Sequence, residues 1–186
     1  MSRAAPTAAE ETRAWSAWRA AAARPEIDAA LLGLYADVDA AIAERGPTCW
    51  TSGNCCRFVE FGHRLYVTAL EVAWFTRQVA AGAGPTGAEP TDRHAGDGAG
   101  LRLPQFAETA GACPYQAAGR CTTHRVRPLG CRIFFCQTGT EDWQQSLYED
   151  FLRRLRALHD EHGVAYRYLD WIAGLDAASA TWPAAG

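Results

Sequence analysis

Apolar residues recur every three or four positions in the first quarter of the chain, which is the spacing of an amphipathic helix. Residues 8–23 predict a first helix of modest amphipathicity. A second helix is expected to begin at Pro25, because proline suits the first helical position, and to end near Gly46 and Pro47. The apolar face of this second helix consists of Ile27, Leu31, Leu34, Val38 and Ile42.

Two Thr-x-x-Glu patterns predict helix starts further along the chain. In this pattern, called a capping box, the threonine and glutamate side chains each accept a hydrogen bond from a backbone N–H at the helix start. Thr68 to Glu71 predicts a helix that runs to about Ala81, and Thr138 to Glu141 predicts one that runs to about Glu161. The apolar face of the later helix consists of Trp143, Leu147, Phe151, Leu155 and Leu158.

The other segments complete a mainly helical fold. Residues 58–68 predict a short β-hairpin around Gly62 and His63, and residues 166–177 predict a last short helix. Residues 82–100, rich in glycine and alanine, predict a flexible loop. We therefore expect a mainly α protein with a short β-hairpin, a small α+β fold in which helices frame irregular cysteine-rich metal-binding loops. Residues 1–186 are expected to form a single domain, with a cysteine-cluster region at 49–136 and helical extensions at 8–45 and 140–178.

Composition and charge exclude several classes of function. A chain of 186 residues that is 48% hydrophobic and carries a net charge of −3 is typical of a globular protein with a buried core. No basic run supports nucleic-acid binding, and no apolar stretch approaches the roughly 20 residues of a membrane span. The N-terminal residues carry no secretory signal pattern, so a cytoplasmic location is expected, where thiols stay reduced.

The candidate chemistry lies in seven cysteines that gather in two segments. Thiolates ligate metals, and an odd count in a reducing compartment favours metal over disulfides. Cys55 and Cys56 are adjacent, and neighbouring side chains point in different directions. The two thiolates are therefore expected to ligate two different metals, or two irons of one cluster, instead of one ion. The spacings match neither a zinc finger nor a bacterial ferredoxin run. We expect all seven to ligate metal: Cys49, Cys55, Cys56, Cys113, Cys121, Cys131 and Cys136.

The neighbours of these cysteines suggest how a metal centre would be supported. Arg127 and Arg132 flank Cys131 and are expected to donate N–H bonds to the thiolates and to offset their charge. His124 is either a ligand or a polar neighbour of the site. Four aromatic residues are expected to shield a cluster from water or simply to pack in the core: Trp50, Tyr115, Phe134 and Phe135.

The cysteine region resembles the bacterial YkgJ-type cysteine-cluster family, a zinc- or iron-chelating domain with a CxxCxxCC signature. The signature matches Cys49, Cys55 and Cys56, but Ser52 stands where the family has its second cysteine. The later half of the family pattern matches Cys113-Pro114-Tyr115, Gly119, Cys121, His124, Arg127-Pro128, Cys131-Arg132, Phe134 and Cys136. The resemblance covers about residues 49–136 and leaves the ligand set one thiolate short.

Together the residues and the resemblance predict an iron-binding protein that holds an iron–sulfur cluster and has an electron-transfer, sensing or accessory role. Its partner would be an unknown redox or other protein. A zinc or mononuclear iron site in a structural or interaction module is the alternative. An enzyme is the third reading, since the resemblance extends to cysteine-cluster proteins similar to flagellin lysine methylases, but the sequence contains no methyl-donor motif.

Overall fold

The computed structural model describes residues 5–48, 53–82 and 111–181, and within them the chain is mainly helical, which confirms the expected fold class. The α-helices are α1 (Ala8–Ala22), α2 (Pro25–Arg45), α3 (Phe58–Phe61), α4 (Ala69–Ala80), α5 (Leu129–Ile133), α6 (Glu141–Glu161) and α7 (Trp171–Ala180). Two 3-10 turns, η1 (Asn54–Cys56) and η3 (His124–Val126), and the short strands β1 (Tyr66–Thr68), β2 (Gln116–Ala117), β3 (Arg120–Cys121) and β4 (Tyr168–Asp170) complete the described elements.

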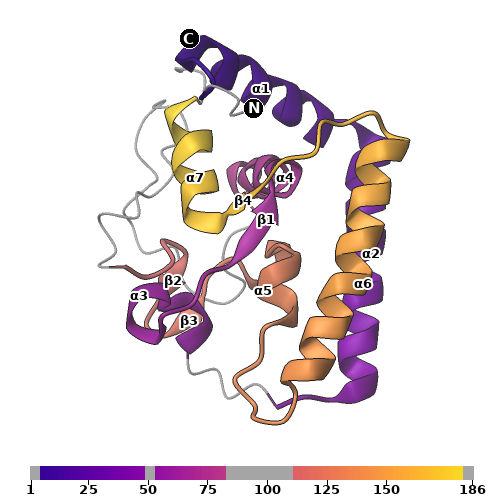
Figure 1. Cartoon of the computed structure of the whole chain (residues 1–186), viewed down its shortest axis with the longest axis vertical. Helices are drawn as coiled ribbons and strands as arrows, with labels where there is room; N and C mark the ends of the chain where they lie inside the picture. The colour runs from indigo at the N-terminus through magenta and orange to yellow at the C-terminus, as the bar shows by residue number, and fades with distance from the viewer. Residues whose placement is uncertain (1–4, 49–52, 83–110, 182–186) are drawn as a thin grey trace.

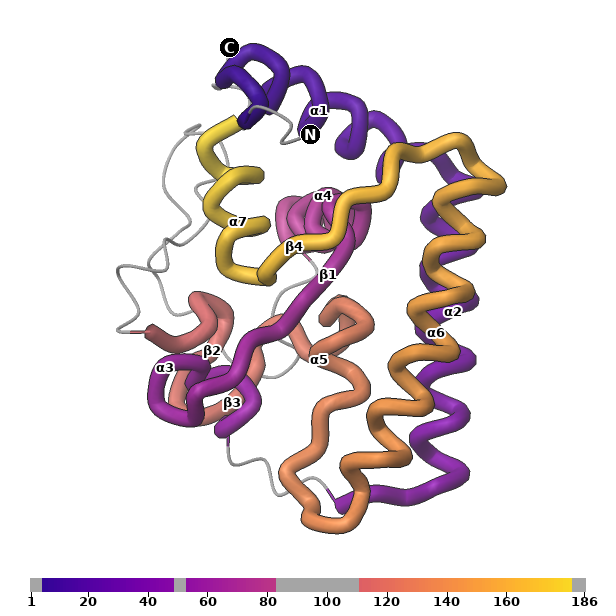
Figure 2. The backbone as a smooth tube through the Cα atoms, viewed as in Figure 1, coloured from indigo at the N-terminus to yellow at the C-terminus, as the bar shows by residue number. Residues whose placement is uncertain are grey.

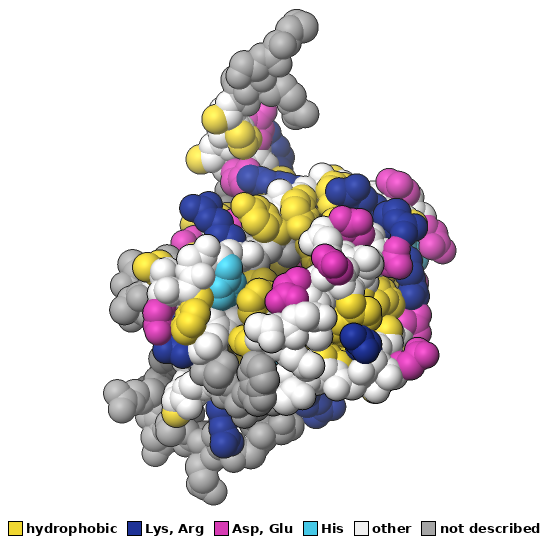
Figure 3. All heavy atoms as spheres, turned by 60° about the horizontal axis from the view of Figure 1, so that its bottom comes forward, with side chains coloured by type: hydrophobic (Ala, Val, Ile, Leu, Met, Phe, Trp, Pro, Cys, Tyr) yellow, Lys and Arg dark blue, Asp and Glu magenta, His cyan; other side chains and the backbone are white. Residues whose placement is uncertain are grey.

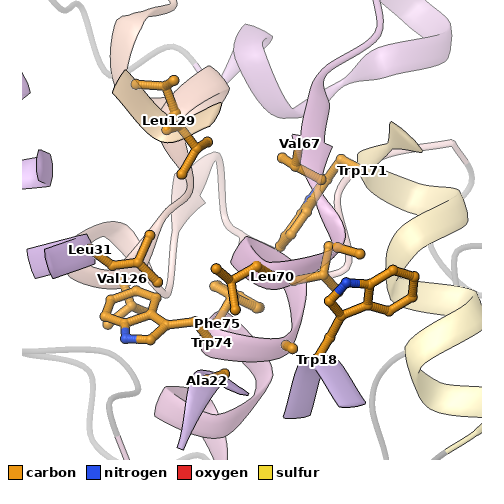
Figure 4. Close-up of a cluster of buried hydrophobic side chains, with 14 of the residues drawn as sticks. Trp18, Ala22, Leu31, Val67, Leu70, Trp74, Phe75, Val126, Leu129 and Trp171 are labelled. Atoms are coloured by element: carbon orange, nitrogen blue, oxygen red, sulfur yellow. The ribbon is translucent and has the colours of Figure 1, made fainter. Parts of the chain in front are cut away.

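Helix α4 lies at the centre of the fold and is packed on several sides. The long helices α2 and α6 run side by side at one edge, α1 crosses α4, and α7 covers another side of it (Figures 1 and 2). Apolar side chains of α4, among them Leu70, Trp74 and Phe75, fill the core that these elements enclose (Figure 4). The core is therefore mainly helical, and Cys113 and Tyr115 of the cysteine segments pack into it.

The capping box at the start of α4 is formed as predicted. Thr68 Oγ1 accepts a hydrogen bond from the backbone N–H of Glu71, and the Glu71 carboxylate accepts one from the backbone N–H of Thr68. The helices expected from residues 8 and 25 are confirmed as well. Local sequence signals thus account for three of the described helices.

The hairpin predicted at residues 58–68 is wrong. Residues 58–61 form the single turn α3, which ends at Gly62 in the left-handed conformation (φ +64°). Strand β1 then pairs antiparallel with the distant β4, with Val67 opposite Leu169. The short hairpin of the fold is instead β2–β3, whose turn residues Ala118 and Gly119 both have positive φ, as a two-residue hairpin turn requires. The choice of strand partner is a tertiary property that local alternation does not encode.

The two C-terminal helices start later than the sequence patterns indicate. Helix α6 is present, but it begins after Thr140, whose hydroxyl donates to the carbonyl of Gln137 instead of capping the helix. Helix α7 begins only at Trp171, because residues 168–170 are paired in β4, and Asp170 caps it by accepting from two backbone N–H groups. The predicted flexible loop at 82–100 lies outside the described residues apart from Gly82.

The described surface has mixed charge. On the face shown in Figure 3, acidic, basic and apolar side chains are interspersed. None of the helices in the described ranges is both long enough and apolar enough to cross a membrane.

Candidate metal centre

Hydrogen bonds to backbone carbonyls join the two cysteine segments to each other. The backbone N–H of Cys113 donates to the carbonyl of Cys56 at 2.6 Å, and the Gln116 side-chain amide donates to the carbonyl of Gly53 at 2.8 Å. The N–H of Val59 donates to Gly111 at 3.2 Å. These contacts connect η1 and α3 with the segment that leads into the β2–β3 hairpin. In Figure 1, α3 lies beside this hairpin.

Three thiols at this junction interact directly. The sulfur atoms of Cys55 and Cys56 are 3.8 Å apart. Interaction with Cys113, and then with Cys55, raises the pKa of Cys56 far above its usual 9.0. The same interactions lower the pKa of Cys55 to about 6 and lower that of Cys113, because each can accept a hydrogen bond from Cys56 when ionised. The trio therefore favours a mixed state in which Cys56 keeps its proton.

Two further thiols lie within electrostatic reach of this trio. Cys121, at the end of β3, has its sulfur 3.7 Å from Thr123 Oγ1, and burial raises its pKa, with a further contribution from Cys113. Cys131, in α5, has a pKa raised well above its usual value by burial and then by Cys113 and Cys121. The structure thus gathers five of the seven predicted ligands.

The other two predicted ligands are placed differently. Cys136 is exposed at the end of the segment that follows α5. Cys49, together with Trp50 and Ser52, lies outside the described residues. The ligand roles expected for Cys49 and Cys136 therefore remain predictions.

Arg127 lies beside the gathered thiols, as the sequence suggests. Its positive charge lowers the pKa of Cys55, Cys121 and Cys131, although other influences on these thiols are larger. Burial lowers the pKa of Arg127 itself. Its Nε atom is buried and has no hydrogen-bond partner among the described residues. The guanidinium is thus a cation held near sulfur with an unused donor.

Arg132 has contacts other than those expected. Its guanidinium donates to Asp39 at 2.8 Å and to the carbonyls of Arg127 (2.9 Å) and Arg125 (2.8 Å), and it stacks over the ring of Tyr35 at 4.4 Å. The hydrogen bonds recorded for it in the described part of the chain go to oxygen, because its side chain turns back across the preceding loop. Its role is to hold the loop that carries Arg127.

The two histidines near the cysteines differ in environment. His124, the possible ligand, is exposed in η3. His63 lies 3.1 Å from the carbonyl of Cys55 through Nε2, and its ring stacks on Phe134 at 4.9 Å. The sequence places His63 in a turn and gives no signal for this contact. Phe134 therefore packs beside the cysteine segment, as expected of a shielding aromatic residue.

Trp171 is not among the residues that the sequence places at the site, yet it borders it. Its ring is buried at the start of α7, and its N–H contributes to the lowered pKa of Cys113 after the larger effects of Cys56 and the Tyr115 backbone. Trp171 and His63 also line an open depression of about 530 Å³.

The described thiols do not form a finished metal-binding geometry. Within residues 5–48, 53–82 and 111–181, no three His, Cys, Asp or Glu side chains converge closely enough to hold an ion. The chemistry of the donor set nevertheless fits a soft metal, since thiols from four segments lie near the half-buried guanidinium of Arg127. Binding would require the thiols to turn toward a common centre.

Comparison with family models, curated proteins and solved structures gives no match to this chain.

The pKa values predict an order of thiol reactivity in the metal-free protein. Because the thiolate is the reactive form, we expect Cys55, with a pKa of about 6, to be alkylated by iodoacetamide faster than Cys131 at pH 7. The Cys55 rate should rise as the pH passes through about 6 and then level off. Peptide mass spectrometry after timed quenching between pH 5 and 8 measures both rates. Equal rates at the two residues would contradict the ordering.

Proposed function

We propose that this protein binds iron through its cysteines, in the form of an iron–sulfur cluster, and serves in electron transfer, sensing or support of a redox partner. The observation that carries the proposal is the gathering of five cysteines in one region beside the half-buried Arg127: Cys55, Cys56, Cys113, Cys121 and Cys131. Cys49 and Cys136 complete the proposed ligand set. The resemblance to the YkgJ-type family points to the same chemistry.

The residues around the thiols suit a cluster in particular. A bound iron–sulfur cluster would supply a centre that takes up and releases single electrons. A site with many thiolates accumulates negative charge, and Arg127 would offset part of it. The packing of Phe134 and His63 against the Cys55 segment would limit contact with water. A cytoplasmic location, where thiols stay reduced, is part of this proposal.

The first test is anaerobic purification followed by iron, sulfide and zinc analysis and a visible spectrum. Matching iron and sulfide with broad thiolate-to-iron absorption is the expected result. Replacing Cys56→Ser should remove at least half of the iron and most of that absorption, because Cys56 is at the centre of the thiol trio. His124 is exposed, and His124→Ala should leave the iron content and the absorption unchanged. A loss of iron in this variant would indicate that His124 is a ligand.

Zinc analysis distinguishes the iron–sulfur protein from the alternative, a zinc-binding module. Stoichiometric zinc without sulfide would make the protein a zinc-binding structural or interaction module, and the proposed redox role would be wrong. A preparation that binds neither metal under anaerobic, reducing conditions would exclude both.

A further inference from the structure

Three polar hydrogens near the thiols have no acceptor. Tyr115 Oη, Arg127 Nε and Trp171 Nε1 are buried and make no hydrogen bond within the described part of the chain. Native proteins rarely leave buried donors unpaired, and each such group calls for an explanation. The fourth buried atom of this kind, His159 Nε2, belongs to α6 and packs against Tyr166 instead.

Two of the three donors are fixed beside Cys113. Tyr115 follows Cys113 by two residues, and Trp171 opens α7. The ring of Phe75 packs edge-on against both, with ring centres 4.8 Å from Tyr115 and 4.9 Å from Trp171. Figure 4 shows Phe75 and Trp171 within the buried cluster. Because Phe75 is itself buried in α4, both rings are held in place by the helical core.

The third donor is fixed from the other side. The backbone carbonyl of Arg127 accepts a hydrogen bond from Arg132, and Arg132 is anchored to Asp39 of α2. The charge of Arg127 acts on Cys55, Cys121 and Cys131. An indole N–H and a guanidinium N–H can only donate. The acceptors within electrostatic reach of Arg127 are the sulfurs of Cys131 and Cys121 and the Asp39 carboxylate, and Asp39 already accepts from Arg132.

We propose that Tyr115, Trp171 and Arg127 donate hydrogen bonds to the sulfur atoms of metal-bound cysteines, Cys113 above all. A metal-bound cysteine sulfur carries negative charge and accepts hydrogen bonds that a protonated thiol accepts only weakly. Tyr115 Oη and Arg127 Nε are thus unpaired without a metal, and the Trp171 N–H, which already acts on the Cys113 thiol, is positioned to donate to a metal-bound sulfur. This inference rests on the proposed function, since it assumes that the cysteines ligate a metal.

The test uses anaerobic Co²⁺ titration of the full chain, with affinity measured by chelator competition. Tyr115→Phe keeps the ring and removes only the donor, whereas Trp171→Phe removes the donor together with part of the buried indole ring. Each should weaken Co²⁺ binding by about 10- to 100-fold and shift the sulfur-to-cobalt charge-transfer band to longer wavelength. The melting temperature of metal-free Tyr115→Phe should stay equal or rise, because an unpaired buried donor is removed while the ring is kept.

Trp18→Phe is the matched control. Trp18 is also buried, but its N–H donates to the carbonyl of Ala165 at 2.8 Å. This variant should lower the melting temperature and leave Co²⁺ affinity and the band position unchanged.

The outcomes separate the two proposals. Wild-type binding with unchanged affinity and band position in Tyr115→Phe and Trp171→Phe would overturn the donor role and leave the metal site standing. A lowered melting temperature in metal-free Tyr115→Phe would also overturn it, since Tyr115 Oη would then have a partner in the metal-free protein. A wild type that binds neither Co²⁺ nor iron would overturn the proposed function and this inference together.

Discussion

Replacing Glu71→Ala is expected to destabilise the protein by about 3–5 kcal/mol, the range for disrupting a buried polar network. The carboxylate is 1% exposed and accepts four hydrogen bonds. Two come from Thr68 at the start of α4, one from the Tyr35 hydroxyl of α2 (3.0 Å) and one from the backbone N–H of Leu129 in α5 (2.9 Å). Truncation leaves all four donors buried without a partner, and each costs about 1–3 kcal/mol if it finds none.

Glu10→Ala provides a matched control for this substitution. Glu10 holds the same capping-box position in α1 and accepts from the backbone and hydroxyl of Thr7, but it is exposed and these contacts are local. The Glu10→Ala variant should therefore lose much less unfolding free energy than Glu71→Ala. Urea unfolding of both metal-free variants under reducing conditions measures the difference. Equal losses of unfolding free energy in the two variants would show that the contacts of Glu71 with α2 and α5 do not stabilise the protein.

The Glu71 network also marks where sequence reasoning about the fold ends. The Thr-x-x-Glu pattern predicts the capping box at α4 because both partners lie within one turn. Nothing in the same four residues indicates that Glu71 also binds Tyr35, 36 positions earlier, and Leu129, 58 positions later. The pairing of β1 with β4 is missed for the same reason. Local signals predict elements, whereas partners depend on how the elements pack.

The candidate site divides in a similar way. Cysteine density identifies the two segments, and their proximity follows from the prediction that both ligate metal. The location of Trp171 beside Cys113 does not, because it arises from the packing of α7 against α4 through Phe75. Arg132 shows the opposite error. Its position one residue after Cys131 suggests a contact with sulfur, but the α5 helix directs its side chain toward Asp39 and the Arg125–Arg127 loop.

Gly53→Ala is expected to separate the two cysteine segments and to weaken metal binding by about 10-fold or more, as when groups that orient metal ligands are disturbed. Gly53 has φ +69°, and a Cβ there would lie 2.5 Å from the backbone oxygen of Gly119 and 2.6 Å from the Gln116 side chain. The side chain could move, but the backbone of the β2–β3 turn could not without shifting Cys121. The same change would disrupt the Gln116 to Gly53 hydrogen bond that connects the segments.

Gly163→Ala isolates this steric effect from the cost of the backbone conformation. Gly163 has φ +63°, but a Cβ there meets nothing within 4 Å. Both variants should lose about 1–2 kcal/mol of stability for placing alanine in the left-handed region. Only Gly53→Ala should lose more than that and also bind less metal, as measured by urea unfolding and by Co²⁺ titration with chelator competition. If the two variants bind Co²⁺ with equal affinity, the close approach of Gly53 to Gly119 does not position the thiols, because the cysteines would then reach the metal without that contact.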